Sequence, residues 1–100
     1  MIRHIVFFTV AKGQDAEDVR RKLMMLSRIP HARHFEVTHN IRHDNIAGTQ
    51  VDLVVYGEFD DVQALADFKA HPTYDACIAA VRPLREMRIA ADAEAAPRSD

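Results

Sequence analysis

Residues 1–10, MIRHIVFFTV, carry the strongest structural signal in this chain. The segment is rich in Ile, Val and Phe and is apolar at nearly every position from Ile2 on, which predicts a buried strand. Side chains alternate along a strand, so His4 and Phe8 share one side and Ile5 and Phe7 share the other. We expect the side that carries His4 to face helices.

Three further strands are predicted downstream by alternating or continuous apolar patterns. Together with the first strand they span residues 2–10, 34–43, 51–59 and 84–91. On the second strand, alternation places His39 and Ile41 on the same side as two large apolar side chains.

Helical patterns follow the first and the third of these strands. Asp15 offers an N-cap oxygen to a helix of roughly 13 residues, which Pro30 ends. Asp60 begins a second helix with a capping-box-like pattern, and Val62 belongs to its apolar side. That helix is interrupted and begins again at His71-Pro72-Thr73, because proline is favourable in a first helical turn.

The resulting order is β-α-β-β-α-β, which predicts an α+β fold of the ferredoxin-like type. Right-handed crossovers place both helical regions on one face of a four-stranded antiparallel sheet. We expect one domain over residues 1–94 and a disordered tail over residues 95–100.

The other sheet face has no cover within the chain, although the first and third strands are apolar on both sides. Such a patch is larger than soluble monomers usually expose, so a second copy packed sheet to sheet is expected, giving a dimeric α/β barrel. The alternative is a solvated, partly polar face with scattered apolar residues.

Composition excludes several classes of function. The 100 residues carry a formal net charge of -2, so no overall positive field favours nucleic acid. No apolar run has the length of a membrane span, and the start lacks a signal-peptide pattern. Cys77 is the single cysteine, which fits a reducing compartment. We therefore expect a cytoplasmic protein without nucleic-acid or membrane partners.

Five short motifs make the chain resemble the stress-responsive dimeric α/β-barrel family (Dabb). They are MIRHIVFF at 1–8, FDDV at 59–62, FKAHP at 68–72, VRPL at 81–84 and RIAAD at 88–92. The resemblance covers about residues 1–94 and implies a homodimer of ferredoxin-like chains. Most members of that family have no assigned reaction, and one relative is a polyketide cyclase that works without a cofactor. The resemblance matches His4 to a first-strand histidine of that cyclase, whereas Phe68 and Tyr74 stand where the cyclase has a tyrosine and a histidine.

His4 is the main candidate for chemistry, because a neutral imidazole among apolar neighbours can act as a general base. Tyr74 is the candidate for an orienting hydroxyl. The substrate-binding candidates are Phe8, Phe68, His71 and Ile78. The alternatives are a hydrogen-bonded core histidine, core aromatic residues and, for His71, a structural role at the start of a helix.

The remaining histidines raise the question of a metal site. They are His31, His34, His39 and His43. Strand geometry places His34 and His39 on opposite faces and keeps His39 and His43 about 13 Å apart, so we expect no metal. No glycine-rich phosphate loop is present, and we expect no cofactor.

Two functions remain open. The first is a homodimer with a small apolar pocket in each subunit, which binds a hydrophobic or aromatic metabolite and catalyses cofactor-free proton transfer, cyclisation or isomerisation. The second is a non-catalytic, stress-linked assembly protein. A cavity of roughly 300 Å³ or more would favour the first, and a filled interior the second.

Overall fold

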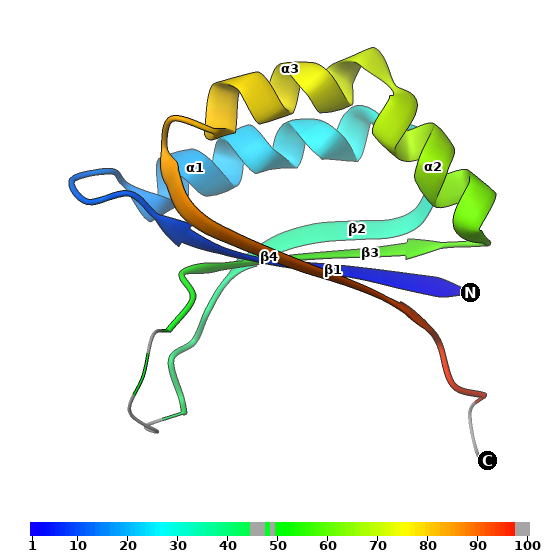
Figure 1. Ribbon diagram of the computed structural model, residues 1–100, viewed down its shortest axis with the longest axis horizontal. Coiled ribbons are helices and arrows are strands. Elements are labelled where there is room, and N and C mark those ends of the chain that lie inside the picture. The colour runs from blue at the N-terminus through cyan, green and yellow to red at the C-terminus, as the bar shows by residue number, and fades with distance from the viewer. Residues whose placement is uncertain (45–47, 49, 98–100) are drawn as a thin grey trace.

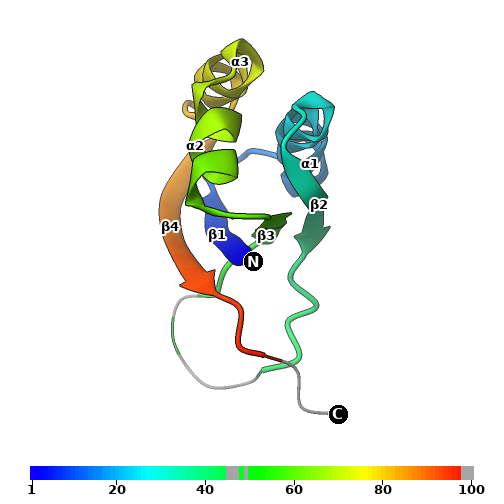
Figure 2. The same cartoon turned by 90° about the vertical axis from the view of Figure 1, so that its right-hand side faces the viewer.

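The computed structural model describes residues 1–44, 48 and 50–97. The elements follow in the order β1 (Ile2–Val10), α1 (Ala16–Leu23), the 3₁₀ helix η1 (Met24–Arg28), β2 (Ala32–His39), β3 (Leu53–Phe59), α2 (Val62–Ala70), α3 (Pro72–Val81) and β4 (Arg85–Glu94). The strands pair in the antiparallel order β2-β3-β1-β4. All helices lie on one face of this sheet (Figures 1 and 2), which confirms the ferredoxin-like fold.

The first helical region reaches the predicted length but changes type halfway. As predicted, the Asp15 side chain caps α1, by accepting a hydrogen bond from the Glu17 amide. The last five residues of the helical region form η1. Leu23, Leu26 and Ile29 are all buried at three-residue spacing. A 3₁₀ helix has three residues per turn, so it directs this series to one side, whereas an α-helix would spread it.

Strand β2 ends four residues earlier than the strand predicted over residues 34–43. β2 ends at His39, because the Asn40 side chain accepts a hydrogen bond from the Arg42 amide, and Arg42 has a positive φ of 55°. Such an Asx turn directs the backbone out of the sheet. Ile41 is consequently 87% exposed instead of facing the helices, and His43 lies outside the strand.

The second helix begins one residue later than predicted. Asp61, not Asp60, accepts the capping hydrogen bond from the Ala64 amide, at 2.8 Å. Asp60 instead forms an ion pair with Arg33 at 2.6 Å. This shift turns Val62 outwards, where it is 68% exposed.

Strand β4 is three residues longer at its C-terminal end than predicted. It pairs with β1 along its length, and Glu94 lies opposite Ile2. Beyond it, the Ala95 amide donates to the Met1 carbonyl at 2.9 Å. The predicted disordered tail therefore begins with a paired residue, and residues 98–100 lie outside the described part of the chain.

Gly57 leaves room for an aromatic ring in the core between sheet and helices. A Cβ added there would lie 2.9 Å from Cε2 of Phe59, which is fully buried against Phe68. We predict that Gly57→Ala lowers the free energy of unfolding by about 1–2 kcal/mol, because crowding exceeds the gain from a less flexible unfolded chain. Urea unfolding measures this, and unchanged stability would contradict it.

Candidate functional site

A cavity of about 250 Å³ lies between the sheet and α3. Most of its lining is aliphatic and aromatic, and its polar groups come from one histidine, one tyrosine, one cysteine and three arginines. The lining residues are His4, Val6, Phe8, Leu23, Leu26, Phe35, Val55, Phe68, Tyr74, Cys77, Ile78, Val81, Arg82, Arg85 and Arg88. Its volume is slightly below the range typical of drug-sized ligands and suits a small ring compound.

His4 and Asp92 form the polar pair beside this cavity. The two residues lie opposite each other on β1 and β4, and Nδ1 of His4 is 2.5 Å from a carboxylate oxygen of Asp92. His4 is 3% exposed, whereas Asp92 is partly open to solvent. A carboxylate only accepts, so Nδ1 of a neutral His4 donates to Asp92, and Nε2 retains the free lone pair.

The surroundings of His4 favour its neutral form. Burial lowers its pKa below 6.5 by penalising the imidazolium ion, and the hydrogen bond to Asp92 partly opposes this effect. The imidazole is therefore neutral near pH 7 and can accept a proton at Nε2. If it does, the adjacent carboxylate stabilises the resulting charge. This arrangement has the chemistry of a general base with its orienting acid.

Aromatic side chains build one wall of the cavity. Phe68 packs edge-on against Phe59 and Tyr74, with ring centroids 5.0 and 5.9 Å away. Phe35 lies 5.8 Å from the same ring. This stacking holds Tyr74 at the cavity, and no protein partner of its hydroxyl is present among the described residues. The hydroxyl is thus free to bond to a ligand.

Five of the six candidate site residues meet at this cavity. They are His4, Phe8, Phe68, Tyr74 and Ile78. His71 does not line it: its Nδ1 accepts a hydrogen bond from the Thr73 amide at 3.1 Å and caps α3. His71 thus begins α3, which is the position that the structural alternative gave it.

Sequence reasoning missed Asp92 and the three arginines. Asp92 was visible only as part of a family motif, because the predicted last strand ended at residue 91, whereas β4 continues to Glu94. His4 and Asp92 are 88 positions apart, and only the register between β1 and β4 joins them. Arg82, Arg85 and Arg88 are spaced by three residues across a loop and a strand, a pattern that matches no single element.

Cys77 and the other histidines lack the arrangement of a metal centre. Within residues 1–44, 48 and 50–97, no three His, Cys, Asp or Glu side chains come close enough to hold an ion. His34 lies beside Glu36, and burial raises the pKa of the Cys77 thiol to about 11. The thiol therefore remains protonated.

No helix in the described part of the chain has both the length and the apolar character needed to cross a bilayer.

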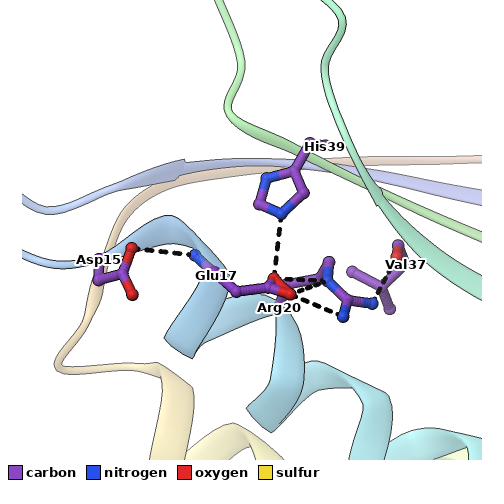
Figure 3. Close-up of polar contacts among 5 residues, drawn as sticks. All are labelled: Asp15, Glu17, Arg20, Val37 and His39. Carbon is purple, nitrogen blue, oxygen red and sulfur yellow. Dashed lines mark hydrogen bonds and ion pairs between the residues drawn. The ribbon is translucent and has the colours of Figure 1, made fainter.

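His39 belongs to an ion cluster that joins α1 to the end of β2 (Figure 3). The Glu17 carboxylate accepts from Arg20 Nη2 at 2.7 Å and lies 3.1 Å from His39 Nε2. Arg20 also reaches the Val37 carbonyl. Hydrogen bonds from Arg20 and then His39 lower the pKa of Glu17 to about 2. The cluster is exposed, so its contribution to stability is small.

Acid should remove this contribution. A carboxyl with a lowered pKa stabilises the folded state above its unfolded pKa, near 4.5, and this effect disappears as the pH falls towards 2. We predict that Glu17→Gln lowers Tm by a few degrees at pH 6 and that the difference shrinks below pH 4.5. Glu86→Gln on β4 is the control. A Glu17→Gln deficit that stays constant down to pH 2.5 would count against this assignment.

Fold and cavity define the class of protein: a ferredoxin-like chain with a small, mostly apolar cavity between its sheet and helices. The family model of the stress responsive A/B barrel domain matches residues 2–95, so the chain belongs to that family. A search of curated proteins gives no significant match.

Solved structures similar to this chain share its fold. A Dabb family protein from Mesorhizobium loti is 26% identical with a TM-score of 0.75, over 96% of this chain and 97% of that one. A protein from Arabidopsis thaliana has a TM-score of 0.82 at 14% identity, over 99% of both chains. A dimeric protein of unknown function from Thermobifida fusca has a TM-score of 0.73 at 22% identity, over 91% of this chain and 87% of that one.

Proposed function

We propose that this protein is a homodimer in which each subunit binds a small hydrophobic or aromatic metabolite and catalyses cofactor-free proton transfer, cyclisation or isomerisation. The observation that carries the proposal is the His4–Asp92 pair beside an otherwise mostly apolar cavity. A buried, charge-paired base next to space for a ligand is typical of a site for proton transfer.

The dimer would form through the sheet face that carries no helices (Figure 2). On that face the strand pairings align Val54, Phe7 and Ile89 in one row and Tyr56, Ile5 and Ala91 in the next. Phe7 is 37% and Ile89 is 52% exposed. This continuous apolar band supports a second copy as its cover, and the similar Thermobifida fusca protein is dimeric.

In the proposed reaction, Nε2 of His4 takes a proton from an acidic C–H or phenol group of the ligand. Asp92 stabilises the imidazolium ion that forms, and the Tyr74 hydroxyl donates to the ligand oxygen on which negative charge develops. The proton then returns to the product from His4. Phe8, Phe68 and Ile78 hold the ring of the ligand and keep water out.

A non-catalytic, stress-linked assembly role is the second candidate. The cavity of about 250 Å³ favours the assembly role in one respect, since this volume is smaller than that of most ligand sites.

The proposal also includes a cytoplasmic location, which the single buried thiol of Cys77 supports.

Deuterium exchange in the presence of the protein tests the two candidates. A panel of small phenols, acetophenones and 1,3-dicarbonyl compounds is incubated with the protein in D₂O, and NMR follows exchange at each acidic C–H position. The proposal expects accelerated exchange in at least one compound class. Exchange at the buffer rate for all of them, with no binding, would favour the assembly role.

A further inference from the structure

Three arginines line the cavity. Arg82 follows α3, Arg85 begins β4, and Arg88 lies further along the same strand. No Asp or Glu is among the lining residues, and none of the three guanidinium groups has an acidic partner within the described ranges. The whole chain has a net charge of -2, so this positive charge is a local feature of the cavity.

Arg85 and Arg88 lie on the same strand as Asp92, nearer to its start. Arg88 is paired with Phe8 and Asp92 with His4, so four strand positions separate the two pairs. Four positions correspond to roughly 13 Å between backbone sites. The apolar side chains of Val6, Phe8 and Ile78 line the same cavity. A ligand that uses the whole cavity therefore meets cationic groups, apolar walls and a neutral base that lies further along the sheet.

We infer that the ligand of this site is a small aromatic carboxylate. The inference rests on the proposed function and specifies its substrate class. The ring lies between the apolar walls, the carboxylate binds the guanidinium groups of Arg85 and Arg88, with Arg82 adding positive charge, and the position that loses a proton faces His4. Guanidinium groups bind carboxylates through two parallel hydrogen bonds, which fixes the direction in which such a ligand enters.

Unpartnered arginines also explain why the ligand should be an anion and not a neutral ring. A neutral ring would fill the apolar part of the cavity and leave the three positive charges uncompensated beside it. A carboxylate replaces their water with a charge-assisted contact at the edge of a low-dielectric site, where the attraction exceeds that between fully exposed ions.

Matched probes separate the carboxylate from the ring. Benzoate is compared with benzamide, and 1-naphthoate with 1-naphthamide, by NMR titration of the dimer at low ionic strength. We expect each carboxylate to bind at least tenfold more tightly than its amide. The triple variant Arg82→Met, Arg85→Met, Arg88→Met retains much of the aliphatic bulk, and it should lose this preference while its affinity for the amides is unchanged. Arg21→Met, on the exposed side of α1, is the control and should behave as the wild type.

The outcomes distinguish this inference from the function beneath it. Equal affinity for carboxylates and amides, or an undiminished preference for carboxylates in the triple variant, would refute the inference that the ligand is a carboxylate. The proposal that the cavity binds a small ring compound would still stand. If no probe of either kind shifts resonances of cavity residues at millimolar concentration, both the pocket and the carboxylate are rejected. Circular dichroism and sedimentation of the triple variant confirm that it is folded and has the oligomeric state of the wild type.

Discussion

Replacing Phe7 with aspartate is expected to convert the protein from a dimer to a monomer. Phe7 lies on the central strand β1, between Val54 and Ile89 in the apolar row of the open face. In a two-fold dimer of packed sheets, Phe7→Asp would bury one unpaired charge from each subunit. We expect the dissociation constant of the dimer to rise by a factor on the order of 10³, as for a central hot spot.

Sedimentation at micromolar concentration measures this change. The wild type should sediment at twice its chain mass of 11.3 kDa, and Phe7→Asp at the chain mass. Val62→Asp is the matched control, because Val62 is also an exposed apolar residue but lies on α2, on the helical side. A wild type that sediments at 11.3 kDa, or a Phe7→Asp variant that stays dimeric, would refute the proposed interface.

Replacing His4 with glutamine is expected to abolish proton transfer and leave the dimer intact. Glutamine can still donate a hydrogen bond to Asp92 but has no basic nitrogen. A positioned general base accelerates proton transfer by roughly 10²–10⁴, so ligand exchange in D₂O should slow by a similar factor. Phe7 and the open face lie on the other side of β1, and sedimentation should be unchanged.

Two comparisons show whether His4 acts as a base or only fills the core. Asp92→Asn removes the charge that supports the imidazolium ion and should also slow exchange, with binding of the ligand retained. In the wild type, the exchange rate should still be maximal at pH 6.5. It should decline only when the pH falls through the pKa of His4, which burial lowers below 6.5. A His4→Gln variant with wild-type exchange would assign His4 to the core alone.

The same lowered pKa has a consequence for stability. Between the pKa of folded His4 and 6.5, the unfolded chain binds more protons than the folded one, so stability falls as the pH falls through this interval. His4→Gln should remove this part of the pH dependence. Urea unfolding between pH 7.5 and 5 measures the difference.

The helix-facing side of β1 was predictable, because alternation along a strand depends only on neighbouring residues. His4, Val6 and Phe8 are all buried on that side, as expected. The start of a new helix at Pro72 was predictable for a similar reason, since proline and the His71 cap act within one helical turn. Ile41 and Val62 show where local patterns fail to predict burial. The hydrogen bond between the Arg42 amide and the Asn40 side chain turns Ile41 outwards, and the shift of the α2 cap by one residue turns Val62 outwards.

The sequence by itself determined the order of the elements, the side on which His4 lies and the surplus of apolar surface on the sheet, since these follow from local periodicity and composition. Only the tertiary structure decided that Asp92 is the partner of His4 and that three arginines lie at the cavity of that pair. Those contacts join residues from the two ends of the chain, and the hydrogen-bonded register of β1 against β4 brings them together. No pattern within a single segment encodes that register.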